Sequence, residues 1–311
     1  MAHYLVTGGA GFIGSHLVRA LLAAGHRIRI LDNLCTGTRE QCVPEAELCT
    51  EDIRRFDAIL PAFDGVDGVF HLAALPSVQH SLEYPRESHA VNVDGTLHVL
   101  EAARRSGVRR VVFSASSAAY GDQEIMPICE TASLAPKSPY GLHKWIGEEY
   151  ARTYARCFGL ETVSLRYFNV YGHGMRAEGA YSSVIAIFLE RRVAGAALTI
   201  TGDGTQTRDF VHVRDVVRAN MLAMTSPNVG RGEVMNIGAG KHWSVHAVAA
   251  KIGGPVTYVP ARLEPHDTLA DIHRAQQLLD WRPEVDFDDG IRELLALHHL
   301  PVPTSPTAVS A

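Results

Sequence analysis

Short apolar runs alternate with helix-like segments through the first half of the chain, and this alternation limits the possible folds more than any other feature. The runs are rich in β-branched residues and nearly continuous, as in HYLVTG, RIRILD, GVFHLA, RRVVFSAS and ETVSLRYFNVYG. Such runs are typical of strands that are buried on both faces of a parallel sheet. Because strands that alternate with helices are joined by right-handed crossovers, the sequence predicts an α/β fold with a doubly wound parallel sheet.

A repeated glycine supports the same interpretation. Gly25, Gly107 and Gly159 each follow a helix-like stretch and precede an apolar run. Helices commonly end at a glycine in the left-handed conformation, since glycine has no Cβ to clash there. We therefore expect three helix-to-strand connections of one kind.

The segment TGGAGFIGSHL places Gly9, Gly11 and Gly14 in the pattern G-x-G-x-x-G, between the first predicted strand and a helix that begins near Phe12. The glycines permit a tight turn, and the helix N-terminus presents N–H groups to a pyrophosphate. Asp32 ends the second predicted strand, where a carboxylate accepts hydrogen bonds from the adenosine ribose. Its charge would repel a 2′-phosphate, so the pattern favours NAD over NADP in a Rossmann-type fold. The alternative is that these residues only form turns.

The strand-helix rhythm breaks after Gly172. A glycine-containing loop, the amphipathic stretch SVIAIFLERRVAG and the short run LTITGDG follow, and the chain ends in PVPTSPTAVSA. This break predicts a smaller C-terminal lobe, and the Pro/Ser/Thr/Ala-rich end predicts disorder. The predicted division is an NAD-binding domain at 1–171 with a return segment at 208–238, a substrate-binding lobe at 172–207 and 239–300, and a disordered tail at 301–311.

Charge and composition restrict the partners of the chain. A net charge of −5 gives no broad basic surface for nucleic acid or an anionic membrane. The start MAHYLVTGG has no signal-peptide pattern, and no segment approaches the ~20 apolar residues that cross a membrane. We expect a cytoplasmic protein with a small-molecule partner, whose five cysteines are free thiols. Cys35, Cys42 and Cys49 lack the paired short spacings of zinc sites, so no metal site is predicted.

The stretch SPYGLHKW places Tyr140 four positions before Lys144, on one face of a predicted helix. A nearby ammonium and a positive nicotinamide ring favour the phenolate, which can then accept a proton from a sugar hydroxyl. By spacing alone, such a pair is more often an ordinary surface feature. The strand RRVVFSASS changes this interpretation, because it ends in Ser114, Ser116 and Ser117 at the edge that faces the ligand crevice of a doubly wound sheet.

With these motifs together, the chain resembles the extended short-chain dehydrogenase/reductases. It is most similar to the UDP-sugar 4-epimerases within the NAD-dependent nucleotide-sugar epimerase and dehydratase branch. The resemblance covers most of residues 3–295 and rests on TGGAGFIG, EDIR, HLAA, NVDGT, FSASSAAYG, SPYGLHK, LRYFNVYG, GDGTQTRDFVHVRDV and LADIHRAQQLLDW.

This resemblance implies a role for each matching residue. Ser116, Tyr140 and Lys144 match the catalytic residues, with Tyr140 as the base and Lys144 on the nicotinamide ribose. The implied NAD-binding residues are Gly8, Gly11, Phe12, Ile13, Asp32, Asn33, Asp52, Ile53, Leu72, Ala73, Asn92, Tyr140, Lys144 and Tyr167. The implied substrate-binding residues are Ser117, Asn169, Arg176, Arg208, Arg262 and Thr268. Bland alternatives remain for four of them: Ser117 as a backbone partner, Asn169 as a turn former, Arg208 as a partner of Asp209 or Asp215, and Arg176 as an exposed loop residue.

The resemblance also implies a reaction. The dehydratases carry an Asp-Glu pair directly after the catalytic Ser/Thr, and the decarboxylating members usually carry Glu two positions after it. Here Ser117 and Ala118 follow Ser116, so we expect 4-epimerisation of a UDP-sugar through a transient 4-keto sugar. A dehydratase, a decarboxylase and a non-catalytic NAD-binding sensor are the alternatives, and the sensor is disfavoured because the tyrosine, lysine and serine are all kept.

The sugar is open at this point. Thr268 occupies the gatekeeper position of the hexose and N-acetylhexosamine 4-epimerases, and its small size admits an N-acetyl group. Arg176 lies where UDP-glucuronate 4-epimerases carry an arginine, which makes glucuronate the alternative. The stretch RLEPHD is one residue shorter than the usual family stretch, so the loop after Arg262 can differ. Family members commonly pair through two long helices, and we expect a homodimer.

Overall fold

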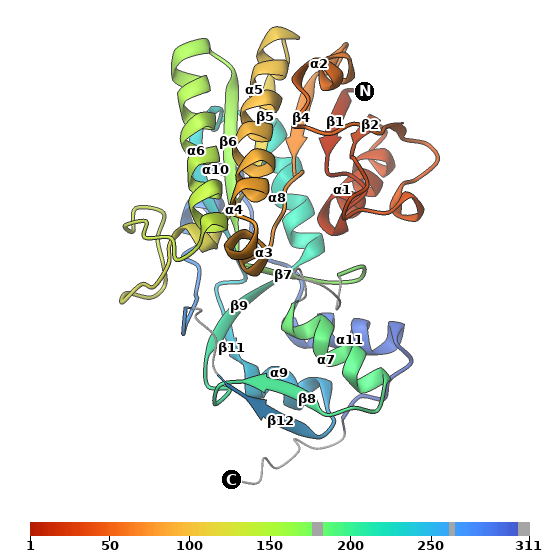
Figure 1. Ribbon diagram of the computed structural model, residues 1–311, viewed down its shortest axis with the longest axis vertical. Coiled ribbons are helices and arrows are strands. Elements are labelled where there is room, and N and C mark those ends of the chain that lie inside the picture. Colours follow the sequence, from red (N-terminus) through yellow and green to blue (C-terminus); the bar gives the residue numbers. More distant parts are fainter. Residues whose placement is uncertain (176–182, 261–264, 304–311) are drawn as a thin grey trace.

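The computed structural model describes residues 1–175, 183–260 and 265–303, and its main sheet is parallel throughout, in the order β10-β6-β5-β4-β1-β2-β3 (Figure 1). The predicted doubly wound, Rossmann-type α/β fold is confirmed. The chain order reverses between β1 and β4, and ligands of such sheets bind outside the carboxyl ends of the strands at this point. The strands are β1 (His3–Thr7), β2 (Arg27–Leu31), β3 (Glu47–Cys49), β4 (Gly68–His71), β5 (Arg110–Ser116), β6 (Glu161–Tyr167) and β10 (Arg231–Ile237).

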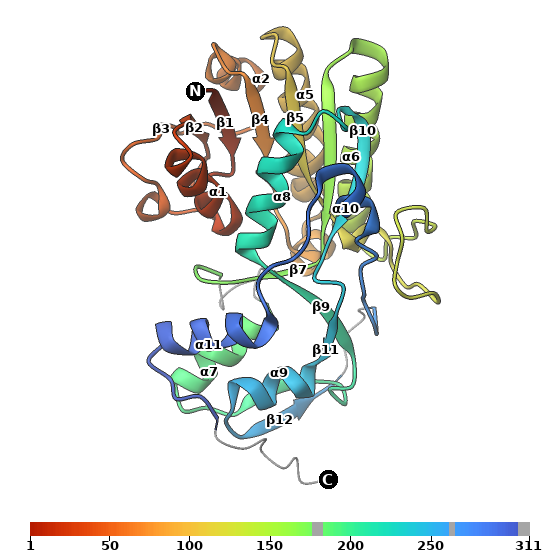
Figure 2. The same cartoon turned by 180° about the vertical axis from the view of Figure 1, so that it is seen from behind.

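Helices cover both faces of this sheet. One face carries α2 (Phe56–Ile59), α5 (Gly95–Arg105) and α6 (Pro139–Phe158), with the short α3 (Val78–Glu83) and α4 (Pro85–His89) beneath α6 (Figure 1). The other face carries α1 (Phe12–Ala23), α8 (Val213–Thr225) and α10 (His273–Leu279) (Figure 2). Each face is sealed by its own apolar cluster.

Helix α6 carries the Tyr-Lys pair, and the sequence defines both of its ends. Ser138 is the N-cap, since its hydroxyl accepts a hydrogen bond from Gly141 N at 3.2 Å, and Pro139 opens the first turn. Gly159 ends the helix with φ of 71°. Gly25 and Gly107 follow α1 and α5 with φ of 82° and 67°. The left-handed conformation predicted for all three glycines is confirmed.

A second group of elements lies beyond the carboxyl ends of the main strands. Strands β7 (Asn169–Tyr171), β9 (Thr207–His212) and β11 (His242–Ser244) pair in one small sheet, and β8 (Leu198–Thr201) pairs with β12 (Val256–Val259). Helices α7 (Val184–Val193), α9 (Val245–Ile252) and α11 (Phe287–Leu297) pack with them around a separate apolar cluster (Figure 1). Phe287 stacks between Phe210 and Trp243, with ring centroids 5.5 and 5.1 Å away.

The chain returns to the main sheet late. Helix α10 contacts β10 and α8, and Trp281 is fully buried in the cluster beneath α1 and α8. These residues fall in the range 239–300 that the sequence assigned to the smaller lobe. The exact division into domains therefore stays a prediction.

Some predicted features lie outside the described residues. These are Arg176, Arg262 and residues 304–311 of the predicted tail. Within the described ranges, no helix combines the length and apolar character needed for a membrane span, and no three His, Cys, Asp or Glu side chains gather in a way that would hold a metal ion.

Candidate active site

The glycine loop lies between the carboxyl end of β1 and the N-terminus of α1. Gly8 has φ of 72°, and a Cβ built on it would lie 2.7 Å from the main-chain N of Ala73. A Cβ on Gly14 would collide with the carbonyl oxygen of Gly8. Helix α1 begins with Phe12 and Ile13, and no described side chain caps its first turn. The loop is therefore a close-packed cradle below free helix N–H groups, which suits a dinucleotide pyrophosphate.

Asp32 is held at the end of β2. Its two carboxylate oxygens accept hydrogen bonds from Ala10 N at 3.0 Å and Leu34 N at 2.8 Å, and burial raises the pKa of this carboxyl. Asn33 donates to Asp52 at 2.9 Å, while the hydrogen bonds from Arg54 lower the pKa of Asp52 to about 2. The residues predicted to contact the adenosine ribose and the adenine are thus hydrogen-bonded to each other at one edge of the cradle.

The predicted contacts after β4 meet on the other side of the cradle. The main chain of Leu72 and Ala73 donates to the carbonyl and the hydroxyl of Thr7 at 3.1 and 3.2 Å. Asn92 is buried and holds the main chain of Leu75, accepting from its N–H at 2.8 Å and donating to its carbonyl at 3.0 Å. Ile53, also predicted for the cofactor, packs against Gly95, where a Cβ would come within 2.6 Å of its side chain.

Tyr140 lies in the first turn of α6, buried against the end of β5. Its main-chain N–H donates to the Ser81 hydroxyl at 3.1 Å, which leaves the phenol group to face the strand end. Burial raises the pKa of this phenol, and a hydrogen bond with Ser116 opposes the rise. Ser116 is the last residue of β5 and also accepts from Ala118 N at 3.2 Å. The structure thus brings the predicted base and the predicted serine together.

Lys144 follows one helical turn later and is almost fully buried. Its Nζ donates to the Ser114 carbonyl at 2.7 Å and lies 5.1 Å from the centre of the Phe113 ring. Burial lowers the pKa of Lys144 to about 8, and the negative charge of Glu148 works in the opposite direction. Lys144 therefore stays mostly protonated at neutral pH and provides a buried positive charge beside Tyr140.

Tyr167 and His71 support the strand ends. The Tyr167 hydroxyl lies 3.0 Å from the Ser114 hydroxyl and 2.9 Å from Asn220 Oδ1, and burial raises its pKa to about 12. His71 lies between the hydroxyls of Thr7 at 2.7 Å and Thr96 at 3.0 Å, and burial lowers its pKa to about 3. A neutral imidazole that is hydrogen-bonded at both ring nitrogens gives His71 a structural role.

The predicted substrate residues gather where β7 meets β9. Asn169 Nδ2 donates to the Asp209 carbonyl at 3.1 Å and to the Thr268 hydroxyl at 3.4 Å. Arg208 donates to the carbonyls of Thr207 and His266 at 2.9 and 2.8 Å. Ser117 opens a 3-10 helix, Ser117–Ala119, directly after Ser116. Asn169, Arg208 and Thr268 therefore form one group beyond the carboxyl ends of the main strands, while Ser117 stays beside the catalytic candidates.

Comparison with known proteins identifies the family. Residues 4–238 match the model of the NAD dependent epimerase/dehydratase family. The chain belongs to this family. A UDP-glucose 4-epimerase of Corynebacterium glutamicum is 36% identical over 298 residues, which cover 90% of each chain.

Solved structures agree with this assignment. The UDP-glucose 4-epimerase of Thermotoga maritima, solved with UDP-glucose, has a TM-score of 0.91 and 36% identity over 96% of this chain and 98% of its own. The Thermus thermophilus UDP-glucose 4-epimerase, solved with NAD, has a TM-score of 0.89 and 36% identity over 96% and 99%. These comparisons confirm the predicted family and its NAD dependence, and they support the predicted 4-epimerisation of a UDP-sugar.

In this member of the epimerase/dehydratase family, several residues that contact the predicted site residues were not predicted from the sequence. Glu148 pairs with Arg166 through two hydrogen bonds of 2.8 and 2.6 Å. Its negative charge also raises the pKa of Lys144, against the effect of burial. Its position four residues after Lys144 was the available signal. Ser81 and Asn220 gave no local signal, because they reach Tyr140 and Tyr167 only through the tertiary fold.

Asp209 was not predicted either, and it stabilises the loops around the predicted substrate residues of this epimerase/dehydratase member. Its carboxylate is fully buried and accepts hydrogen bonds from Ala239 N, Gly240 N and Ala270 N at 2.6, 3.0 and 3.0 Å. Burial raises the pKa of Asp209 to about 6 against the effect of these three donors. All three donors are main-chain N–H groups, so the Asp209 carboxylate holds residues 239, 240 and 270 against β9. Arg208 directly precedes Asp209 in this strand.

We expect Asp209→Asn to destabilise the protein by about 1–3 kcal/mol, because the new amide NH₂ must face at least one main-chain N–H. The free energy of unfolding from urea titration measures this loss. Asp203→Asn is the matched control, since Asp203 is exposed in the same region and accepts hydrogen bonds from Thr205. Equal stability of Asp209→Asn and the wild type would contradict this role of Asp209.

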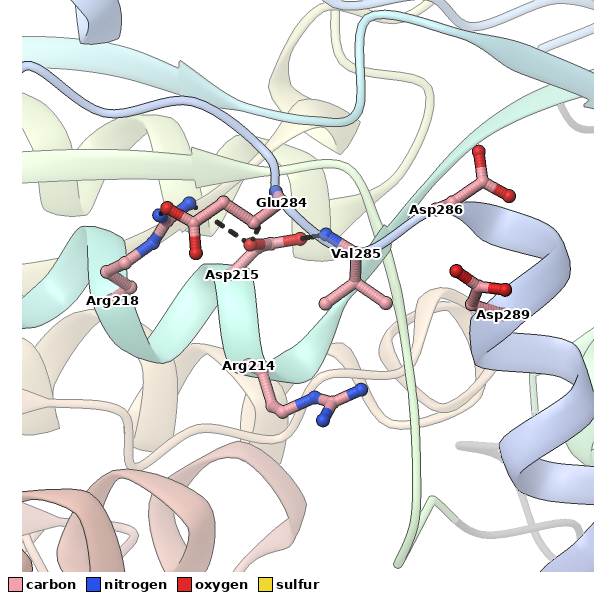
Figure 3. Close-up of a pocket in the computed structure, with 7 residues that line it drawn as sticks. All are labelled: Arg214, Asp215, Arg218, Glu284, Val285, Asp286 and Asp289. Atoms are coloured by element: carbon pink, nitrogen blue, oxygen red, sulfur yellow. Dashed lines mark hydrogen bonds and ion pairs between the residues drawn. The ribbon is translucent and has the colours of Figure 1, made fainter.

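A cavity of about 470 Å³ lies away from the cradle, between the start of α8 and the start of α11 (Figure 3). Its lining is an internal network in which Asp215 accepts from Arg218 at 3.1 Å and from the main chain of Glu284 and Val285 at 2.9 and 3.1 Å. None of the predicted site residues within the described ranges lines it. We therefore assign it to the joint between the main sheet and α11 and not to the chemistry of the family.

Proposed function

We propose that the chain catalyses the NAD-dependent 4-epimerisation of a UDP-sugar. The observation that carries this proposal is the buried Tyr140, which is hydrogen-bonded to Ser116 and lies one turn before the buried ammonium of Lys144. The group lies at the carboxyl end of β5, on the same sheet edge as the glycine cradle. A phenol, a hydroxyl and a cation in this arrangement suit proton transfer to and from a sugar hydroxyl.

We propose that the cradle holds NAD, whose nicotinamide supplies the acceptor and donor of the C4 hydride when it is bound. Gly8, Gly11, Phe12 and Ile13 would contact the pyrophosphate, and Asp32 with Asn33 would accept and donate hydrogen bonds at the adenosine ribose. The remaining proposed contacts are Asp52 and Ile53 at adenine, then Leu72, Ala73, Asn92, Tyr140, Lys144 and Tyr167 along the rest of the cofactor.

In the proposed mechanism, the Tyr140 phenolate accepts the proton of the sugar 4-hydroxyl while Ser116 holds the same oxygen. Lys144 favours the phenolate through its positive charge, which offsets the effect of burial on the tyrosine. The 4-keto sugar would then turn over so that the opposite face of C4 meets the hydride donor, and Tyr140 would return its proton to the same oxygen. The substrate leaves with inverted C4 and unchanged mass.

The lack of an acid-base pair directly after Ser116 supports epimerisation over loss of water or carbon dioxide. The 3-10 helix that follows Ser116 is Ser-Ala-Ala and carries no carboxylate. We propose that Asn169 and Arg208 bind the diphosphate, with Ser117 and Thr268 at the sugar, and Thr268 is small enough to admit an N-acetyl group. Arg176 and Arg262 are the other proposed contacts, and Arg176 favours glucuronate as the alternative sugar because guanidinium binds carboxylate.

The test is a panel of UDP-glucose, UDP-N-acetylglucosamine and UDP-glucuronate, each incubated with the NAD-loaded protein. We expect chromatography to resolve the 4-epimer of glucose, of N-acetylglucosamine or of both, with no change in mass. Conversion of glucuronate alone would favour the alternative substrate. A product lighter by water or carbon dioxide, or no conversion of any of the three, would overturn the proposed reaction.

We also propose that two copies pair through α5 and α6, and that the protein acts in the cytoplasm. Leu142 and Phe158 on α6 expose 41% and 55% of their surface, which a partner helix could cover. Light scattering should give the mass of two chains, and the mass of one chain would contradict the pairing.

A further inference from the structure

A second cavity, of about 250 Å³, lies at the β10 edge of the main sheet, beside α6 and α10; Figure 2 shows the positions of these three elements. None of the predicted cofactor or substrate residues that the structure describes lines this cavity. Its lining is dominated by guanidinium groups, with two carboxylates among them: Arg152, Arg156, Arg166, Arg231, Arg274, Glu130 and Glu233. We call it the arginine cavity.

The two carboxylates of the arginine cavity already accept hydrogen bonds from main-chain N–H groups. Glu130 accepts a hydrogen bond from Asn236 N at 2.8 Å. Glu233 accepts from the main-chain N–H groups of Gly230 and Arg231 at 2.7 and 2.8 Å. Among the described residues, Arg156 and Arg231 form no ion pair. Arg152 and Arg166 pair with Glu149 and Glu148, which lie outside the lining. The guanidinium charge left for a ligand is therefore mainly that of Arg156 and Arg231.

Arg166 provides an independent sign of a ligand. Its side chain is only 3% exposed, and its Nε and Nη2 donate to Glu148. The guanidinium lies over the Tyr120 ring, 4.6 Å from its centre, and within the described residues no acceptor reaches the buried Nη1. A buried N–H group without an acceptor is unfavourable, and an oxygen atom of a ligand in the cavity would provide one.

The backbone is shaped to bring these arginines together. Strand β10 is irregular between Arg231 and Glu233, where its register against β6 shifts. Gly232 lies between them with φ of 85°, and a Cβ there would lie 2.8 Å from Cα of Arg152. The glycine thus lets α6, with Arg152 and Arg156, approach the edge strand that carries Arg231. Irregularities of this kind are common next to binding sites.

We propose that the arginine cavity binds a phosphate group. Several guanidinium forks around one small volume match the many oxygens and the double negative charge of a phosphate better than a single carboxylate. Inorganic phosphate and a small phosphate monoester share this chemistry. The site is separate from the nucleotide cleft and does not depend on the proposed epimerisation.

The experiment titrates inorganic phosphate and glycerol 3-phosphate into the full chain by calorimetry, with NAD and UDP in excess to fill the dinucleotide and nucleotide sites. We expect one site with a Kd of about 1 mM or tighter. Affinity at least about tenfold higher for glycerol 3-phosphate than for phosphate would assign a phosphorylated small molecule, and equal affinity would assign the free ion.

The double variant Arg231→Gln/Arg274→Gln should weaken binding at least about tenfold. Arg231 is exposed and Arg274 is half-buried, and neither forms an ion pair among the described residues, so we expect the variant to fold. The control Arg39→Gln/Arg86→Gln removes the same charge elsewhere on the surface and should bind like the wild type. No binding to the wild type, unchanged binding in the cavity variant, or an equal loss in the control would overturn the proposal.

Discussion

Tyr140→Phe should abolish nearly all epimerisation while the protein stays folded and binds NAD. The substitution removes one oxygen, and general acid-base groups contribute about 10²–10⁴ to a rate, or roughly 3–5 kcal/mol of transition-state stabilisation. The ring of Tyr140 is buried and its main-chain N–H bonds Ser81, so phenylalanine keeps both the packing and the capping contact. The measurement is kcat for the preferred UDP-sugar, with NAD binding followed by calorimetry.

Tyr150→Phe is the matched control for this prediction. Tyr150 lies on the same helix, ten residues further on, and packs beside the cluster under α5, away from Ser116 and Lys144. It should keep the wild-type rate. A Tyr140→Phe enzyme that retains more than about a tenth of the wild-type kcat would show that another group moves the proton.

Lys144→Met should lower both the rate and the affinity for NAD. Methionine fills similar space but removes the buried charge that favours the phenolate and the donor proposed for the nicotinamide ribose. Without this charge, the pKa of Tyr140 stays raised by burial, so the acid limb of the kcat profile should move to higher pH. The wild-type lysine itself stays charged below about pH 8, since burial lowers its pKa to that value.

The pH profile separates an electrostatic role from simple loss of packing. A merely structural Lys144 would reduce the amount of active enzyme equally at every pH. Lys241→Met is the matched control because Lys241 is exposed and lies outside the cradle. A Lys144→Met enzyme with normal NAD affinity and an unmoved pH profile would contradict the role proposed for Lys144.

The sequence predicts the sheet well, because buried parallel strands leave continuous apolar runs and three of the crossovers end at a recognisable glycine. The glycine loop, Asp32, Ser116, Tyr140 and Lys144 are predicted for a similar reason. Each lies directly after a strand or in the first turns of a helix, so local pattern fixes its place at the sheet edge.

The remaining site residues depend on contacts between distant segments. Asp209 receives hydrogen bonds from residues 239, 240 and 270, and no local spacing encodes these. Arg166 meets Glu148 across two elements, and the arginine cavity needs the irregular turn at Gly232 to form. Such features follow from tertiary packing, where many register choices satisfy the same apolar pattern.

The late return of the chain to the main sheet limits how this protein can be divided. The cluster beneath α1 contains Val216 and Met224 of α8, Leu279 of α10, and Trp281. A fragment ending near residue 171 would keep the glycine cradle and the Tyr-Lys pair but leave this sheet face uncovered, and exposed apolar surface of that kind promotes aggregation. The nucleotide-binding part therefore cannot be moved into another protein as a separate domain. During synthesis, its apolar cluster beneath α1 stays incomplete until residue 281 has left the ribosome.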